Sequence, residues 1–205
     1  MKHYLVTTAL EETLPNEKSK ITFLGNWCKL YDLKDKYKLY ECHTEPYHYD
    51  DLDKTEKDYK KINLIYEKVL EDISKKLNEV HKVNYSKRYW RISIGYWLGI
   101  FIQILYDRYL ILKKVFKNNC FDEIITLRHE EGSLIADNSI KFIQYAYEDE
   151  WNEYIFSKLI SFLNPKLKVR KVKKKFEKER LKSLNKSLIK KYLIKFKKYF
   201  LKKVT

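Results

Sequence analysis

The stretch from Asn84 to Tyr109 constrains the fold more than any other part of the sequence. It is the densest apolar and aromatic run in the chain, and it contains Trp90 and Trp97. Charged residues stand near both of its ends: Arg88, Arg91, Asp107 and Arg108. A segment that is apolar in its middle and charged at its ends is typical of a helix at the centre of a domain. The sequence therefore predicts a central helix that is buried on most sides, with its ends at a surface or a site.

A transmembrane helix is the alternative for this stretch. The apolar run is shorter than the ~20 residues that a helix needs to span a bilayer. It is also interrupted by Gly95, Gly99 and Gln103. A helix in a protein core therefore accounts for the pattern better than a membrane span does.

The composition favours a helix-rich domain in a reducing compartment. The 205 residues suffice for one domain, with or without an appendage. Only four Gly and three Pro occur among them, which argues against a turn-rich β sandwich. The three cysteines, Cys28, Cys42 and Cys120, lack the spacing of zinc or redox motifs. Because the N-terminus also shows no signal-peptide pattern, we expect free thiols in the cytoplasm.

Positive charge is concentrated near the C-terminus. Residues 166–205 contain 16 Lys and 2 Arg against 2 Glu, a net charge of +16, whereas the whole chain carries +15. Residues 1–165 are therefore nearly neutral. Asn164 and Pro165 mark the change, because proline ends a helix and restrains the residue before it. We predict a domain at residues 1–165 and a Lys-rich tail at residues 166–205.

Apolar side chains recur every four residues in this tail: Leu184, Leu188, Tyr192, Phe196 and Phe200. On a helix they form an apolar ridge bordered by lysines. The ridge can contact an anionic membrane surface, or it can dock on the domain itself. Nucleic-acid binding is the least favoured interpretation, because no phosphate-reading module accompanies the charge. We expect a cytoplasmic protein that is peripheral to the inner membrane.

Three short segments have the composition of strands: residues 3–8, 21–24 and 121–127. Thr7 and Thr8 end the first of them, and Glu11 and Glu12 lie in the polar connection that follows at residues 9–20. In open α/β sheets, ligands bind beyond the carboxyl ends of parallel strands. These four residues are therefore candidates for a site if the sheet is parallel. The alternative for the two glutamates is the solvated start of a helix.

A second polar cluster covers residues 43–53 and contains His48, Asp50 and Asp51. Imidazole and carboxylate groups can form an acid–base pair or bind a metal ion. The spacing matches no metalloenzyme motif. A simpler interpretation is that Asp51 or Asp53 caps the helix that follows.

Four helices follow from apolar periodicity, at residues 54–82, about 84–116, 137–147 and 150–163. The first is the clearest, with Lys and Glu opposite its apolar face. A short loop joins it to the central helix. We therefore expect these two long helices to pack antiparallel.

Five blocks of the sequence carry a resemblance. They are LVTTALEE (5–12), FLGNWCKLY (23–31), PYHYDD (46–51), LNEVHKVNYSKRYWRISIGYWLGIFIQILYDRY (77–109) and DEWNEYIFSKLI (149–160). In this order they resemble the N-terminal half of a family of glycosyltransferase-like proteins from loci for O-antigen and related surface polysaccharides. The blocks cover most of residues 4–163, and the fourth block is long and unusual in composition.

The resemblance implies an α/β fold, a Rossmann-like N-terminal lobe of a GT-B glycosyltransferase. That lobe would receive a glycan acceptor, while a second lobe would hold a nucleotide-sugar; no metal ion or cofactor is implied. A general base would take the proton of the acceptor hydroxyl, and the candidates are Glu11, Glu12, His48 and Asp50. The candidate substrate-binding residues are Thr7, Thr8, Arg88, Arg91, Asp107 and Arg108. Guanidinium groups match phosphate or carboxylate, although Arg108 beside Asp107 is also explained by a simple ion pair.

The sequence also departs from the family pattern. Leu14 stands where the family favours tryptophan. Family members are considerably longer, and the quoted blocks end before residue 163, so a donor-binding lobe is not recognised. One expectation is therefore a shortened transferase that is inactive alone. The alternative is a non-enzymatic module that binds a membrane surface or a partner protein.

Overall fold

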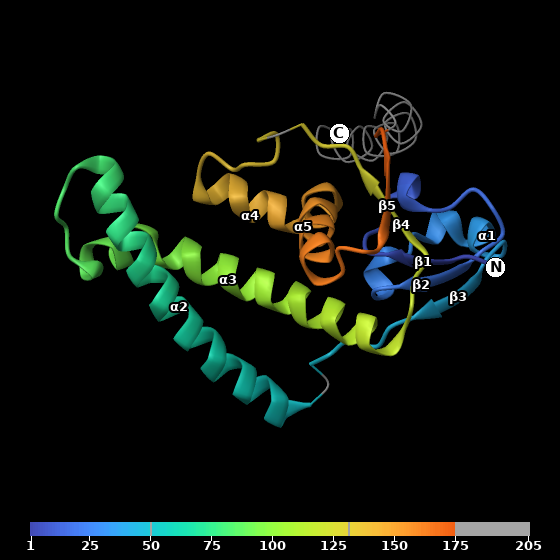
Figure 1. The fold of residues 1–205 in the computed structure, drawn as a ribbon, viewed down its shortest axis with the longest axis horizontal. Helices are drawn as coiled ribbons and strands as arrows, with labels where there is room; N and C mark the ends of the chain where they lie inside the picture. The colour runs from blue at the N-terminus through green and yellow to red at the C-terminus, as the bar shows by residue number, and fades with distance from the viewer. Residues whose placement is uncertain (50, 131, 175–205) are drawn as a thin grey trace, which may run out of the picture. The chain divides into compact units, whose positions relative to one another are not determined.

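A computed structural model describes residues 1–49, 51–130 and 132–174 (Figure 1). Within them lies a five-stranded, all-parallel sheet with the strand order β3-β2-β1-β4-β5. The strands are β1 (His3–Val6), β2 (Lys20–Phe23), β3 (Glu41–Thr44), β4 (Glu123–Leu127) and β5 (Lys168–Val172). This order is that of a Rossmann-like sheet, so the predicted α/β fold is confirmed. The predicted membrane contacts at Leu184, Leu188, Tyr192, Phe196 and Phe200 lie outside the described residues.

The two edge strands are absent from the sequence-based prediction. All residues of β3 and β5 are exposed or half-buried, and β5 reads KVRKV. Edge strands often carry charged residues, which prevent pairing with another chain and also hide the apolar alternation of a strand. Residues 168–172, predicted as tail, instead pair with β4 along its whole length. The compact unit therefore runs to Val172, past the expected boundary at Pro165.

The four predicted helices are present, with boundaries shifted by a few residues. They are α2 (Leu52–His81), α3 (Lys87–Asn118), α4 (Ser139–Tyr147) and α5 (Asp149–Leu163). Shorter turns connect the first strands: η1 (Glu11–Thr13), η2 (Asn26–Cys28), η3 (Tyr31–Leu33) and α1 (Lys34–Tyr37). Asp51 caps α2 by accepting from the backbone N–H groups of Asp53 and Lys54, as predicted.

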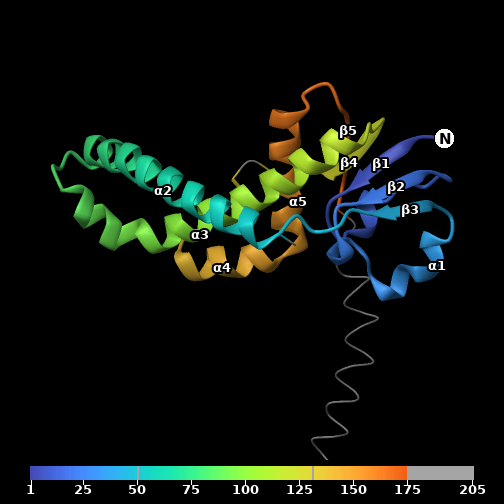
Figure 2. The same cartoon turned by 90° about the horizontal axis from the view of Figure 1, so that it is seen from below.

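Helices α2 and α3 form an antiparallel hairpin that extends away from the sheet (Figures 1 and 2). Its contact is built on the buried side chains of Leu70, Leu98 and Ile102. Gly95 allows the close approach, since a Cβ atom there would lie 2.6 Å from the hydroxyl of Tyr66. This glycine, which interrupts the apolar run, is therefore part of the packing.

The central helix is less buried than predicted. The faces of α3 that meet α2, α4, α5 and the sheet are covered, while Ile92 and Tyr96 are 77% and 75% exposed. The cause is that the hairpin projects beyond the sheet, so the N-terminal half of α3 is covered only where it meets α2 and α4. None of the helices in the described ranges combines the length and the apolar composition needed to cross a bilayer.

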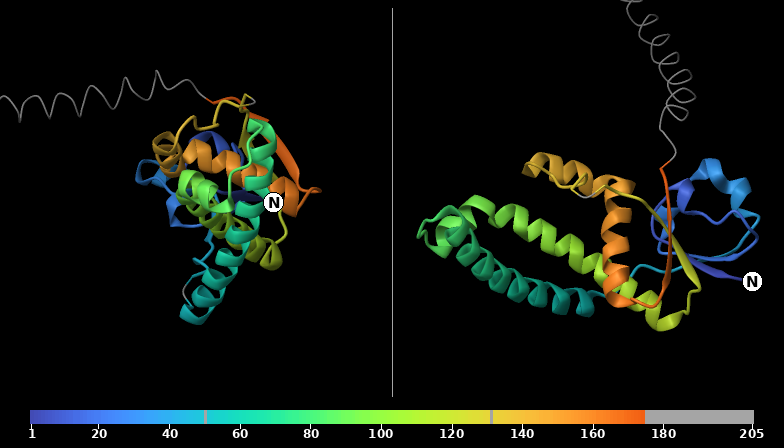
Figure 3. Two further views of the ribbon diagram at one scale, coloured as in Figure 1. Left: turned by 90° about the vertical axis from the view of Figure 1, so that its left-hand side faces the viewer. Right: turned by 45° about the horizontal axis from the view of Figure 1, so that its top comes forward.

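The main core lies on both faces of the sheet. Helix α5 lies against α3 and against β4 (Figure 3). Ile111, Leu112 and Val115 of α3 and Ile160 of α5 are buried in this core. On the other face Phe23 of β2 packs edge-on against Tyr37 of α1, with ring centroids 5.3 Å apart. The sheet is thus covered on one face by long helices and on the other by short turns.

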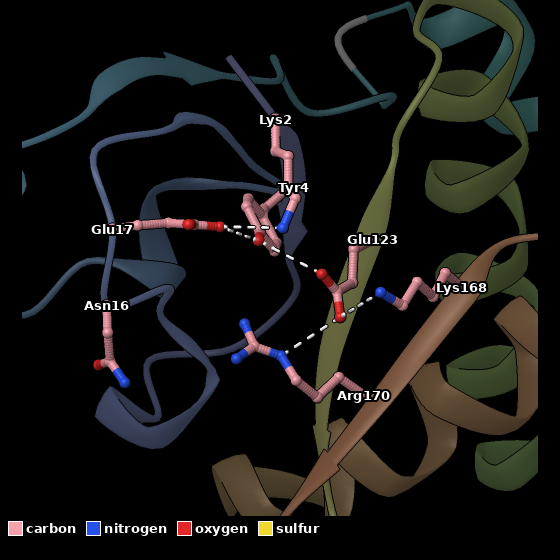
Figure 4. Close-up of a pocket in the computed structure, with 7 residues that line it drawn as sticks. All are labelled: Lys2, Tyr4, Asn16, Glu17, Glu123, Lys168 and Arg170. Carbon is pink, nitrogen blue, oxygen red and sulfur yellow. Dashed lines mark hydrogen bonds and ion pairs between the residues drawn. The ribbon is translucent and has the colours of Figure 1, made fainter.

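A cavity of about 340 Å³ lies at the amino-terminal edge of the sheet (Figure 4). Its centre is the buried carboxylate of Glu123, which is 3.2 Å from Arg170 and 3.7 Å from Lys168. The hydroxyl of Tyr4 donates to Glu17 at 2.8 Å and lies 3.3 Å from a carboxylate oxygen of Glu123. Through these contacts Glu123 of β4 joins Tyr4 of β1 to Lys168 and Arg170 of β5.

Candidate functional site

A larger cavity, of about 500 Å³, lies at the opposite edge, beyond the carboxyl ends of β1, β2 and β3. We call it the carboxyl-edge cavity. It is lined by Thr8, Trp27, Tyr47, Asp107, Arg108, Ile111, Ala146, Tyr147, Asp149, Asn152 and Phe156. The strand order reverses between β1 and β4, and ligands of open α/β sheets bind at such switch points. Its volume lies within the ~300–1,000 Å³ typical of small-molecule sites.

Thr8 reaches the cavity because it comes directly after β1. The residue is 1% exposed, and its Oγ1 finds no hydrogen-bond partner among the described residues. A buried hydroxyl without a partner is uncommon and points to a bound group that satisfies it. Its neighbour Thr7 is also buried, and the carbonyl of Thr7 accepts from the indole N–H of Trp27 at 3.2 Å. Thr7 thus holds Trp27 in the wall of the cavity, and Thr8 supplies a hydroxyl that a ligand can bind.

Asp107 places a carboxylate in the same cavity. Its Oδ1 accepts from the hydroxyl of Tyr47 at 2.8 Å and from Nε2 of His48 at 2.9 Å. Burial alone would raise the pKa of Asp107, but these two hydrogen bonds and the charge of Arg108 outweigh burial and lower the pKa. Asp107 is therefore ionised at neutral pH, and its Oδ2 lies 3.6 Å from Arg108, too far for a hydrogen bond.

His48 holds Asp107 from behind. Its side chain is only 2% exposed, and it does not line the carboxyl-edge cavity. The ammonium group of Lys54 lies 3.0 Å from Nδ1 of His48 and 3.0 Å from its carbonyl oxygen. An ammonium group can only donate, so Nδ1 accepts and the proton is assigned to Nε2, which donates to Asp107. His48, a predicted base, is thus placed to orient Asp107.

Arg108 is fixed between two helices. Its Nε and Nη2 donate to Oδ1 of Asn152 at 2.8 and 2.5 Å, and Nη1 donates to the carbonyl of Ile104. Burial lowers the pKa of Arg108, and the neighbouring Asp107 opposes that effect. A guanidinium group keeps its proton at neutral pH in any protein environment. The site therefore presents a rigid cation beside a carboxylate.

Another cavity, of about 340 Å³, adjoins the carboxyl-edge cavity. Three residues line both cavities: Tyr47, Asp107 and Arg108. The adjoining cavity also contains Tyr49, Tyr59 and Gln103. Asp107 and Arg108 therefore stand on a wall between two spaces, where a molecule longer than one ring can lie across them.

The structure thus brings together Thr8, Asp107 and Arg108, with His48 in contact behind them. The remaining predicted bases do not join them. Glu11 forms an ion pair with Lys36 at 3.2 Å, and Glu12 lies in the same η1 turn; neither lines the cavity. Asp50 lies outside the described residues.

Two predicted substrate-binding arginines lie elsewhere. Arg88 and Arg91 are exposed in the first turns of α3, at the far end of the hairpin (Figure 1). Arg91 forms two hydrogen bonds with Glu67 of α2, at 2.5 and 2.7 Å. At 1.5 Å per residue, Arg91 is about 26 Å from Arg108 along the helix. One ligand of the size of the cavity does not reach both.

Several lining residues were missed by the sequence reasoning. Tyr47, Asp149 and Asn152 all lie inside the quoted blocks PYHYDD and DEWNEYIFSKLI. The resemblance therefore pointed to the right segments, but nothing in the sequence distinguished these three residues from their neighbours. Asp149 also ties α5 to the first strand, since its Oδ1 accepts from the N–H of Ala9 at 3.3 Å.

A buried pair, Glu153 and His129, was also missed. Glu153 of α5 is 1% exposed and accepts from Nε2 of His129 at 2.7 Å and from the N–H of Leu127 at 3.1 Å. Burial raises the pKa of Glu153 more than the contacts with His129 lower it. The pair ties α5 to the carboxyl end of β4. Among the described residues, no group of three or more His, Cys, Asp or Glu side chains is arranged to hold a metal ion.

Comparison with known proteins identifies one family. The model of the LIC12162 family transferases matches residues 3–205. The match therefore extends through the Lys-rich segment, beyond the five blocks that carried the resemblance. No curated protein and no solved structure matches the chain. Since the family model covers nearly the whole sequence, the chain belongs to the LIC12162 family of transferases.

Proposed function

We propose that the protein transfers a sugar from a nucleotide-sugar to a glycan acceptor in the synthesis of a surface polysaccharide such as O-antigen. The observation that carries the proposal is the carboxyl-edge cavity, in which an unpartnered hydroxyl, an ionised carboxylate and a fixed guanidinium converge. Membership in a transferase family and the Rossmann-like sheet support it. In the GT-B architecture that the sequence resembles, this lobe receives the acceptor.

Asp107 is the proposed catalytic base. Its hydrogen bonds with described residues go to Oδ1, which leaves Oδ2 for the acceptor hydroxyl. As the acceptor oxygen forms a bond to the anomeric carbon, its proton passes to Oδ2. The bond from that carbon to the donor phosphate breaks, and its electron pair leaves with the nucleotide. Tyr47 and His48 keep the carboxylate aimed at the acceptor throughout.

Thr8 and Arg108 bind the acceptor in this proposal. The hydroxyl of Thr8 gains the partner that it lacks, and Arg108 offers N–H groups to an anionic or hydroxyl-rich sugar. The adjoining cavity with Tyr49 and Tyr59 accommodates a second sugar ring of the glycan. The basic amphipathic sequence after residue 166 supports placement at the inner membrane face, where a surface glycan is assembled.

The experiment is a screen for nucleotide release. The purified protein is incubated with a panel of nucleotide-sugars, each with and without oligosaccharide fragments of surface glycans, and free nucleotide is measured. Release that requires both a donor and an acceptor supports glycosyl transfer. If no donor and acceptor pair gives release above the donor alone, the proposal is wrong.

Thr8→Val tests the cavity as the acceptor site. The variant keeps the shape of the side chain but removes the hydroxyl, so we expect the acceptor Kd to rise by about tenfold, the value of one hydrogen bond. The midpoint of thermal unfolding should stay the same or rise, because a buried unpaired hydroxyl is removed. Thr13→Val is the matched control, since its hydroxyl donates to the carbonyl of Leu10 at 2.8 Å outside the cavity. Thr13→Val should lower stability and leave the acceptor Kd unchanged. If Thr13→Val raises the acceptor Kd and Thr8→Val does not, Thr8 does not bind the acceptor.

Arg91→Ala should leave transfer activity unchanged. Its guanidinium pairs with Glu67 on the exposed surface of the hairpin, and exposed ion pairs contribute little to stability. The comparison is Arg108→Lys, which removes the forked contact with Asn152 and should lower kcat/KM. Steady-state kinetics of both variants decides the matter. Equal losses in the two variants would mean that the end of the hairpin also contacts substrate.

A further inference from the structure

A fourth cavity, of about 450 Å³, lies between α3, α4, α5 and the loop before α4. We call it the aromatic cavity. Aromatic and aliphatic side chains form most of its wall: Ile94, Trp97, Phe101, Leu134, Ile135, Ala136, Phe142, Trp151, Tyr154 and Ile155. Ile135 lines it and is 77% exposed, so the cavity is open to the surface at that residue. An open apolar cavity of this size is costly to leave filled with water, which indicates a ligand.

The rings in its wall are packed mainly on one another. Trp97 stacks on Phe101 with centroids 5.4 Å apart, and Phe142 meets both rings edge-on at 5.9 and 5.8 Å. Trp151 meets Phe142 edge-on as well, at 5.8 Å. Rings arranged in this way contact one another with part of their surface and present the rest, which is apolar, to a ligand.

Two polar side chains of this cavity, Asn138 and Ser93, already form hydrogen bonds within the protein. Oδ1 of Asn138 accepts from the N–H of Lys141 and caps α4, and its Nδ2 donates to Asp137. The hydroxyl of Ser93 donates to the carbonyl of Tyr89 at 3.0 Å. A sugar or a nucleobase needs several polar groups that converge on it. Because ten of the fourteen lining residues are aliphatic or aromatic, the lining favours a hydrocarbon chain over a hydroxylated or heteroaromatic ligand.

The aromatic cavity and the carboxyl-edge cavity lie along the same two helices. On α3, Phe101 lines one and Arg108 the other, about 10 Å apart at 1.5 Å per residue. On α5, Trp151 and Ile155 face the first, and Asn152 and Phe156 face the second. An amphiphile with a chain of moderate length can therefore reach both.

We propose that the aromatic cavity binds the hydrocarbon chain of an amphiphilic ligand, whose polar head lies toward Asp107. The proposed site for the hydrocarbon chain depends only on the lining of the aromatic cavity. The identification of the head as the glycan acceptor rests on the proposed function. The acceptor then belongs to the class of glycans that are linked to a hydrocarbon chain.

The test uses dodecyl maltoside with a brominated chain, below its critical micelle concentration, because bromine quenches tryptophan fluorescence on contact. Trp97 and Trp151 line the cavity, so we expect saturable quenching by the brominated amphiphile and none by maltose. Ser93→Phe places a ring at the cavity and should weaken binding by about tenfold, as if two methylenes lost their contacts. Ile92→Phe is the matched control, since Ile92 is exposed one residue away and does not line the cavity.

The quenching results support or overturn the proposed site for the hydrocarbon chain. Quenching that weakens in Ser93→Phe and not in Ile92→Phe supports the chain site. No saturable quenching, or equal quenching in both variants, overturns it. A parallel titration with vesicles of brominated phospholipid identifies the source of the chain, a free amphiphile or a lipid within a bilayer. Because this readout needs no transfer activity, the chain site can hold while the proposed glycosyl transfer fails, and the reverse.

Discussion

Asp107→Asn is expected to lower the kcat/KM of glycosyl transfer by about 10²–10⁴-fold, the usual contribution of a general base. The amide keeps the shape of the side chain and an oxygen that can accept from Tyr47 and His48, which bond to Asp107 at 2.8 and 2.9 Å. The fold should therefore survive, and the acceptor Kd should change much less than kcat. Steady-state kinetics together with thermal unfolding separates the two effects.

Asp58→Asn is the matched control for Asp107. Asp58 lies in the same hairpin, its side chain is 15% exposed, and it lines neither of the two adjoining cavities. We expect its activity to stay within a few-fold of the unmodified protein. If Asp107→Asn also stays within a few-fold, the carboxylate serves binding only and the base lies elsewhere.

The acid side of the pH profile should report the same carboxylate. The pKa of Asp107 is lowered, so its ionised form persists below the ordinary range of an aspartate, about 3.9. kcat/KM should therefore be independent of this group at neutral pH and fall only as the pH drops below about 4. A base that titrates near neutrality would instead point to a different residue.

Glu153→Ala is expected to destabilise the protein by about 2–6 kcal/mol, the cost of about 1–3 kcal/mol for each of two buried donors that lose their acceptor. The carboxylate is 1% exposed and holds both His129 and the N–H of Leu127. Without it, two buried donors lose their acceptor at the junction of α5 and β4. Glu153→Gln keeps an oxygen and an amide in the same place, so it should cost much less. Urea unfolding at pH 7 measures both, and equal costs would show that only side-chain volume matters here.

The same pair predicts how stability depends on pH. Burial raises the pKa of Glu153 in the folded state, so folding favours its protonated form. Its contribution to stability is largest below the pKa of the unfolded state, about 4.3, and is lost as the pH rises through the raised value. The unfolding free energy of the unmodified protein should therefore fall relative to that of Glu153→Gln as the pH increases from 4 to 7. A difference that grows in the opposite direction would mean that Glu153 is ionised and paired throughout.

Local patterns in the sequence determined much of the fold. The apolar spacing in residues 54–82 and the cap at Asp51 define α2, because a helix side chain contacts neighbours three and four residues away. The inner strands β1, β2 and β4 were predicted because each is buried and apolar. The edge strands β3 and β5 were not, because their residues face water and their strand character comes from pairing with distant backbone.

Tertiary structure alone decided the site. Thr8 was predicted because it follows a strand, and the ends of parallel strands meet at one edge. That His48 meets Asp107, which is 59 residues away in the sequence, follows from the packing of the β3–α2 connection against α3, which no local pattern encodes. His48, a predicted base, thus forms a hydrogen bond with Asp107. Arg91 is paired with Glu67 on the surface, whereas Arg108 lines a cavity. The sequence determined which charged residues stand at the ends of α3. Their burial and their hydrogen-bond partners, which set their pKa values and their access to a ligand, exist only in the folded chain.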